Sequence, residues 1–81
     1  MHPAIINVIP EENYILYLEF DNGEYGWLDM KPFLGYGVFQ RIKNQNMFQQ
    51  VRIKFDTIEW DCGVDLDPEY VYEKCMKSEP A

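Results

Sequence analysis

The pattern of apolar and polar positions near the start of the chain predicts β-strands. Residues 4–10 form a β-branched apolar run closed by a proline, which favours a strand over a helix. Residues 14–20 then alternate strictly, and one face of this segment carries Tyr14, Leu16, Leu18 and Phe20. The next three residues, Asp21-Asn22-Gly23, tolerate the positive φ angles of a tight turn. We therefore expect residues 14–20 to form a hairpin with the segment that follows Gly23.

The length of this turn decides which side chains face each other. A two-residue turn at Asn22-Gly23 predicts three cross-strand pairs: Phe20 with Tyr25, Leu18 with Trp27, and Leu16 with Asp29. Aromatic pairs of this kind stabilise a hairpin by about 0.2–1 kcal/mol each. Both aromatic residues of the second strand would then face the core. The large side chains that we expect in the core are Leu18, Phe20, Tyr25, Trp27, Phe39, Phe48 and Trp60.

The middle of the chain predicts short helical turns and a second hairpin. Residues 29–34 have the pattern of a helical turn or loop, and apolar spacing indicates one or two helical turns over residues 38–43, followed by a turn that contains Met47 and Phe48. Residues 51–55 and 57–60 then predict a hairpin whose pairs are Val51 with Trp60, Arg52 with Glu59, and Ile53 with Ile58. Its turn, Phe55-Asp56, is poor chemistry for a primed two-residue turn, so a register displaced by one residue stays open.

A strongly specified helix start follows the second hairpin. Asp67 can accept hydrogen bonds from first-turn amides. Pro68 is favourable at the first helical position, because the N–H that proline lacks would have no partner within the helix there. Leu66 and Val71 occupy the two positions of a hydrophobic staple, which fixes the angle at which the chain enters a helix. The segment around Trp60, Gly63, Asp67 and Pro68 is therefore interpreted as a structural motif.

The order of the expected elements indicates an α+β fold. The amphipathic pattern of the last helix runs from Pro68 to about Lys77 and leaves residues 78–81 as a frayed tail. At 81 residues the chain is too short for two separate cores, so we expect one domain over residues 1–81, with antiparallel β-hairpins packed against short helices and a C-terminal helix. An apolar fraction of 47% is typical of a globular domain.

A formal net charge of −7 limits the partners that the chain can bind. This charge repels a phosphate backbone, and the basic residues form no cluster, so we expect no direct nucleic-acid binding. It would steer a basic protein partner toward the chain. The longest apolar runs are far shorter than the roughly 20 residues that cross a bilayer. Without a secretory pattern at the N-terminus, we expect no membrane association, a cytoplasmic location, and free thiols at Cys62 and Cys75.

The residue types that carry most enzyme chemistry are scarce in this chain. His2 is the only histidine and Ser78 the only serine, and both lie near the chain ends, which disfavours a nucleophilic triad or a histidine-ligated metal. Asp65, Asp67 and Glu69 begin like a calcium loop, but Tyr70 stands where that loop requires glycine. We therefore expect no enzymatic activity, no catalytic residue, no cofactor and no metal site.

Six residues remain as candidates for contact with a partner. Tyr17, Tyr36 and Tyr70 lie off the expected core stripes, and tyrosine combines a large apolar body with a polar tip. Glu59, Asp61 and Asp65 form an acidic segment beside the motif at Trp60. The sequence gives no indication of oligomeric state.

Several segments of the chain together resemble a known family. They read N-G-E, L-D-M-K-P-F-L, G-V-F-Q-R-I-K, M-F-Q-Q-V, T-I-E-W and G-V-D-L-D-P-E-Y-V-Y. The chain is similar to the bacterial family catalogued as domain of unknown function 2442. The resemblance implies a small α+β fold and carries no established activity, cofactor or catalytic residue. It also implies an association with gene pairs that look like toxin–antitoxin arrangements, and the DNA-reading helix-turn-helix of some relatives is expected to be absent here.

Two hypotheses about function follow. The first is a cytoplasmic protein-interaction module, the acidic antitoxin-like member of a small bacterial protein pair, whose basic partner is encoded nearby. The alternative is a small-ligand-binding sensor or an accessory subunit of a metabolic enzyme, with its ligand beside the segment from Trp60 to Asp67. The product of the neighbouring gene discriminates between them.

Overall fold

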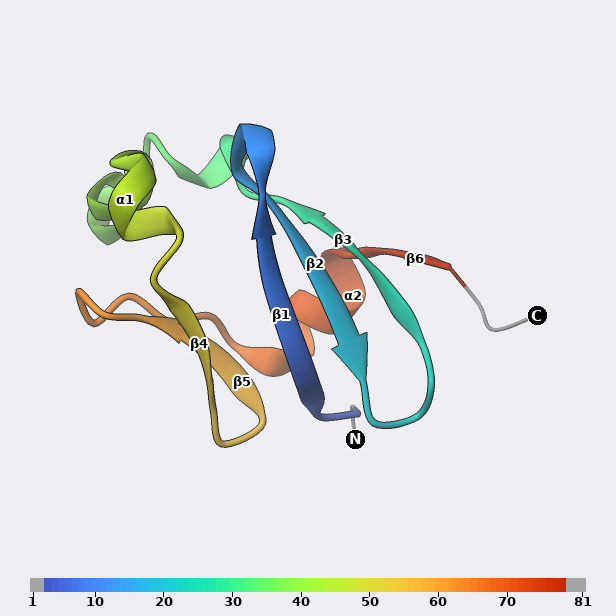
Figure 1. The fold of residues 1–81 in the computed structure, drawn as a ribbon. Coiled ribbons are helices and arrows are strands. Elements are labelled where there is room, and N and C mark those ends of the chain that lie inside the picture. The colour runs from blue at the N-terminus through green and yellow to red at the C-terminus, as the bar shows by residue number, and fades with distance from the viewer. Residues whose placement is uncertain (1–2, 79–81) are drawn as a thin grey trace.

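Two antiparallel sheets organise the fold in the computed structural model, which describes residues 3–78 (Figure 1). The first sheet has the strand order β1-β2-β3-β6 and the second has the order β4-β5. The strands are β1 (Ile5–Glu11), β2 (Ile15–Phe20), β3 (Tyr25–Asp29), β4 (Val51–Lys54), β5 (Thr57–Trp60) and β6 (Met76–Ser78). The helices are α1 (Gln45–Phe48), α2 (Pro68–Lys74) and three 3₁₀ helices at Glu12–Tyr14, Lys31–Phe33 and Gly37–Lys43. The fold is α+β, as expected.

The β2–β3 hairpin has a three-residue loop, and the predicted register was wrong by one residue. Phe20 N donates to Glu24 O (2.9 Å) and Gly23 N donates to Phe20 O (3.1 Å), while Gly23 adopts φ 89°. A loop of this length, with glycine in the left-handed region, is a common hairpin connection. The resulting pairs are Leu16 with Leu28, Tyr17 with Trp27, Leu18 with Gly26, and Glu19 with Tyr25.

The shift of one residue moves two aromatic side chains to the other face of the sheet, because successive side chains of a strand point to opposite faces. Tyr25 and Trp27 were expected in the core. Tyr25 is instead half-buried and Trp27 is 37% exposed, on the face that carries Tyr17 and Glu19. The expected core positions of Tyr25 and Trp27 were therefore wrong, and the sheet gains an aromatic outer surface.

The β4–β5 hairpin has the predicted register. Its pairs are Val51 with Trp60, Arg52 with Glu59, Ile53 with Ile58, and Lys54 with Thr57. The turn consists of Phe55-Asp56, and Phe55 takes a positive φ of 58° to make it. Ile5 N at the start of β1 donates to Asp56 O (3.2 Å), so the hairpin lies alongside the first strand (Figure 1).

The core lies between the inner face of the first sheet, the β4–β5 hairpin and α2. Four residues expected there, Leu18, Phe20, Phe48 and Trp60, are buried, and Phe39 packs against them at intermediate exposure. In the view of Figure 1, α2 lies behind the first sheet. Cys75 is buried and Cys62 is half-buried, and the two residues form no disulfide in the described chain, as expected.

Helix α2 begins as predicted but ends earlier. Asp67 Oδ1 accepts from Glu69 N (2.9 Å), and Leu66 and Val71 are both buried. The helix ends at Lys74, because Cys75 is extended (φ −71°, ψ 145°) and β6 follows. The prediction of helix as far as residue 77 was therefore wrong.

Strand β6 replaces the end of the expected helix. It pairs with β3, and its last residue, Ser78, faces Tyr25. Ser78 had been expected in the frayed tail, and the rest of that tail lies outside the described residues. The physical reason is the edge of β3, whose backbone N–H and C=O groups gain hydrogen-bond partners when the chain returns to it as a strand.

Replacing Asp67 with alanine is expected to lower the free energy of unfolding by about 0.5–2 kcal/mol, because the amide of Glu69 loses its acceptor. Chemical denaturation followed by circular dichroism measures this loss. Asp65→Ala is the matched control, since that exposed carboxylate caps no helix, and its stability should stay close to wild type. Equal losses in the two variants would contradict the capping role.

Candidate functional site

The outer face of the first sheet presents an aromatic surface that the core does not cover. Strand register places Ile9, Tyr17 and Trp27 in one row across β1, β2 and β3, with Tyr25 beside them. We call these four residues the aromatic face. The ring centroids of Tyr17 and Trp27 are 5.6 Å apart, and those of Tyr25 and Trp27 are 5.9 Å apart. The three rings therefore form one packed cluster on the surface, while Ile9 remains 46% exposed.

A carboxylate fixes the orientation of Tyr17 within the aromatic face. Tyr17 OH donates to Glu19 Oε2 (3.0 Å), and Asn7 Nδ2 donates to the other oxygen, Glu19 Oε1 (3.0 Å). Partial burial, followed by this hydrogen bond to the carboxylate, raises the pKa of Tyr17 above its ordinary value. The hydrogen bond to Glu19, which Asn7 also binds, therefore holds the Tyr17 ring in one orientation.

A cavity of about 320 Å³ adjoins the aromatic face at Trp27. Its lining consists of Trp27, Leu28, Asp29, Pro32, Phe33, Tyr70 and Lys74. Tyr70 meets Phe33 edge to face at 5.9 Å, and Lys74 Nζ lies 5.7 Å from the centre of the Tyr70 ring. Trp27 therefore connects two of the predicted contact residues, Tyr17 and Tyr70, along one surface. Sequence reasoning missed Trp27 because the wrong register had placed it in the core.

The third predicted tyrosine lies apart from this surface. Tyr36 is 72% exposed, and its amide N–H donates to Phe33 O (3.0 Å) in the loop before the Gly37–Lys43 helix. Within residues 3–78 its ring contacts no other aromatic ring. The structure therefore leaves Tyr36 as a separate exposed side chain.

The acidic segment is partly compensated by its own hairpin. Glu59 accepts from Arg52 Nη2 and from Lys54 Nζ, each at 3.1 Å, and Asp61 forms an ion pair with Arg52. The hydrogen bond from Lys54 lowers the pKa of Glu59 below its usual range. The contact with Arg52 lowers this pKa further. Asp65 pairs with Glu59 only through the backbone, and its carboxylate is exposed. Two of the three predicted acidic contacts are thus already engaged within the chain.

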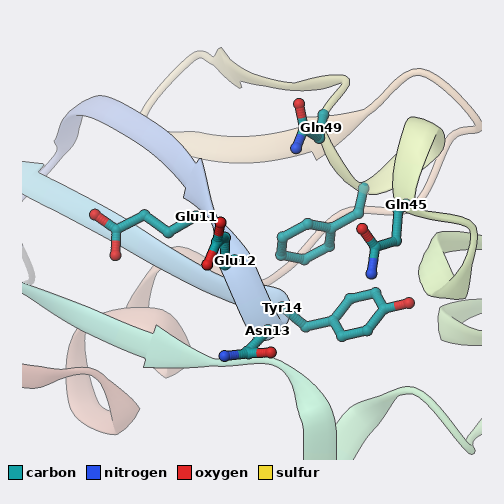
Figure 2. A pocket seen from close by; sticks show the side chains of 7 residues that line it. Glu11, Glu12, Asn13, Tyr14, Gln45 and Gln49 are labelled. Atoms are coloured by element: carbon teal, nitrogen blue, oxygen red, sulfur yellow. The ribbon is translucent and has the colours of Figure 1, made fainter.

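A second cavity, of about 250 Å³, lies where the β1–β2 connection meets α1 (Figure 2). Its lining consists of Glu11, Glu12, Asn13, Tyr14, Gln45, Phe48 and Gln49. Tyr14 meets Phe48 edge to face at 5.2 Å, and its hydroxyl donates to the carbonyl oxygen of Lys43. Figure 2 shows Glu11 extending away from Gln45 and Tyr14. Carboxylates and carboxamides without a cationic group suit a small cation or a neutral polar ligand better than an anion.

No sequence signal had pointed to this second cavity. Its two halves, residues 11–14 and residues 45–49, are far apart in the chain and meet only in the fold. A ligand site was expected beside residues 60–67, but this segment contributes to the core, because Trp60, Val64 and Leu66 are buried. Neither of the two cavities described above is lined by residues of that segment.

The described part of the chain contains no cluster of metal-binding side chains. Between residues 3 and 78, no three His, Cys, Asp or Glu side chains lie together in a way that could hold a metal ion. His2 lies outside the described residues, and Ser78 belongs to β6. None of the helices in the described residues has the length and apolar character to cross a membrane.

The fold and this surface define a small α+β domain with an exposed aromatic face. The chain belongs to the family described as "Protein of unknown function (DUF2442)", whose model matches residues 5–77. The match spans both hairpins and α2. No curated protein and no solved structure matches the chain.

Proposed function

We propose that the chain is a non-catalytic protein-interaction module of the bacterial cytoplasm, and that it binds a basic protein partner through the aromatic face. The observation that carries the proposal is the cluster of Tyr17, Tyr25 and Trp27 on a sheet face that no core residue covers. Tryptophan and tyrosine contribute most to binding energy in protein interfaces. Packed rings on a β-sheet also lose little conformational freedom on binding.

The charge of the chain supports a basic partner. Its net charge is −7, and the outer face of the first sheet carries Glu11, Glu19 and Asp29 around the aromatic face. Asp29 is paired with Lys31 (3.0 Å) and Glu19 is hydrogen bonded, which leaves the exposed Glu11 as the freest of the three carboxylates. The long-range field therefore steers association, while the aromatic rings supply the affinity. We therefore assign the chain the role of the acidic, antitoxin-like member of a small protein pair.

The cavity beside α1 favours the alternative function. A polar cavity of about 250 Å³ lies just below the roughly 300–1,000 Å³ of usual ligand pockets and has room for a small polar metabolite, as in a small-ligand sensor or an accessory subunit of a metabolic enzyme. This alternative places the ligand between Glu12 and Gln45, away from the segment between Trp60 and Asp67 where the sequence had suggested it.

Co-expression with the product of the adjacent gene tests the proposal. Trp27→Ala should weaken the complex about thirtyfold, the effect of removing a central aromatic contact. Tyr36→Ala is the matched control, because it removes an exposed aromatic ring outside the aromatic face, and its affinity should stay within about twofold of wild type. The association rate should fall steeply with added salt, because salt screens charges over a Debye length of about 8–10 Å.

Two results separate the candidates. Absence of a complex with the neighbour, together with tight binding of a small metabolite or of duplex DNA, would overturn the interaction module. Neutralising Glu59, Asp61 and Asp65 together tests whether the acidic segment joins the interface, after circular dichroism has shown that the triple variant folds. Unchanged association in that variant, with loss in Trp27→Ala, would place the interface on the aromatic face alone.

A further inference from the structure

Phe55, at the tip of the β4–β5 hairpin, combines two unfavourable features. Its side chain is 90% exposed, the largest exposure among the large hydrophobic residues described, and its backbone takes φ 58°. The left-handed region is disfavoured for every residue with a Cβ and is an outlier for a bulky one. Glycine is the usual residue at a left-handed turn position, because it has no Cβ to clash. Exposed apolar residues are common on their own, but here exposure and strain fall on one residue.

Comparison with the other strained residues isolates Phe55. Three non-glycine residues within the described chain have positive φ: Asn13, Tyr14 and Phe55. Asparagine tolerates this conformation. The strain at Tyr14 is offset inside the protein, because its ring packs against Phe48 and its hydroxyl bonds to Lys43 O. The ring of Phe55 has no aromatic contact in residues 3–78 and lies almost wholly in solvent. No aromatic contact of the Phe55 ring within the described chain offsets this strain, which the backbone pairing of the hairpin alone has to sustain.

The tip that carries Phe55 is held firmly to the body of the protein. Four consecutive residue pairs join β4 to β5, and Trp60 at the far end is fully buried. Ile5 N donates to Asp56 O (3.2 Å), which fixes the turn against β1. The exposed ring therefore projects from a defined position, and a partner would not have to order the loop on binding.

The surroundings of Phe55 define the surface that would fit it. Ile6, next to the residue that bonds the tip, is 60% exposed. The β2–β3 loop reaches the same end of the molecule, since Asp21 N donates to Ala4 O (2.9 Å) and Ala4 N donates to Asp21 Oδ1 (3.2 Å) (Figure 1). The carboxylates of Asp21 and Asp56 therefore lie at the end of the molecule that presents Phe55.

We propose that Phe55 inserts into an apolar pocket with a basic rim on the protein partner, an inference that rests on the proposed function. The apolar pocket would accept the ring, and basic side chains at its rim would face Asp56 and Asp21. A second copy of the chain fits this surface poorly, because each copy carries a net charge of −7. An anionic lipid surface would repel the same carboxylates.

The test uses a substitution that moves stability and binding in opposite directions. Phe55→Gly relieves the left-handed strain, so its thermal midpoint should be equal to or higher than that of wild type. Its affinity for the product of the adjacent gene should fall about thirtyfold, as expected when an interface aromatic is removed. Val38→Ala is the control, since Val38 is an exposed apolar side chain elsewhere on the surface, and its affinity should be unchanged.

Each other result overturns the inference in a distinguishable way. Full affinity of Phe55→Gly in a complex that Trp27→Ala disrupts would overturn the role of Phe55 and leave the proposed function intact. No complex with the wild-type chain would overturn both. A lower thermal midpoint of Phe55→Gly would show that the ring serves the fold itself. Self-association of the wild type that Phe55→Gly abolishes, measured by sedimentation, would assign the ring to a second copy of this chain.

Discussion

Replacing Trp60 with alanine is expected to lower the free energy of unfolding by about 3–5 kcal/mol, the usual cost of removing a buried aromatic ring. Trp60 has no exposed surface, it packs against Phe48 with ring centroids 6.1 Å apart, and its Nε1 donates to Phe48 O (2.9 Å) in the interior. The substitution therefore leaves a cavity and an unpaired carbonyl oxygen. Domains of this length have about 4–12 kcal/mol of stability, so much of it would be lost.

The second tryptophan provides the control. Trp27→Ala removes a ring that is 37% exposed and lies outside the buried core, so the expected loss comes from its contacts with Tyr17 and Tyr25 and is about 1–2 kcal/mol. Urea unfolding followed by far-ultraviolet circular dichroism measures both variants without relying on tryptophan fluorescence. Equal destabilisation by the two substitutions would contradict the assignment of Trp60 to the core and Trp27 to the surface.

The contrast between the two tryptophans also shows where sequence patterns succeed. The observed register of the β4–β5 hairpin is the one that the sequence favoured over a displacement by one residue, because it places Ile58 and Trp60 inward and Arg52 beside Glu59. The β2–β3 hairpin offered two alignments, since Tyr25 and Trp27 are apolar enough for either face. Which face they occupy depends on whether Asp21 belongs to the turn, and the alternation of residues does not record that.

The end of α2 was missed for a different reason. Helical periodicity continues past Lys74 in the sequence, and local pattern alone cannot detect a free sheet edge elsewhere in the fold. Tertiary pairing with β3 turns residues 76–78 into a strand. The start of α2 could be predicted because a cap and a staple depend only on neighbouring residues, here Leu66, Asp67 and Val71.

The candidate site depended on the β2–β3 register and on the exposure of Phe55, and neither was predicted from the sequence. Tyr17 and Tyr70 were predicted as surface residues, but their connection through Trp27 follows from the observed register. The exposure of Phe55 follows from a turn that its chemistry disfavours. The sequence signal was present in the second case, because an unfavourable residue in a necessary turn is itself a reason to look for a function.

Substitutions of Tyr14 are also expected to change the free energy of unfolding strongly. Tyr14→Ala should lower the free energy of unfolding by about 2–4 kcal/mol, because it removes the edge-to-face contact with Phe48 and the hydrogen bond to Lys43 O while keeping the strained φ of 60°. Tyr14→Gly loses the same contacts but relieves the strain. The left-handed conformation costs an L-residue roughly 1–2 kcal/mol, and glycine costs roughly 0.5–1 kcal/mol in chain entropy.

The glycine variant should therefore be more stable than the alanine variant by about 0.5–1 kcal/mol, which reverses the usual order of these residues. Urea denaturation of both variants under one set of conditions measures the difference. Leu16 supplies the control, because it lies in the regular strand β2, where Leu16→Gly should be less stable than Leu16→Ala. If Tyr14→Gly is also the less stable of its pair, the backbone at Tyr14 is unstrained, and the Tyr14–Phe48 contact then has no strain to offset.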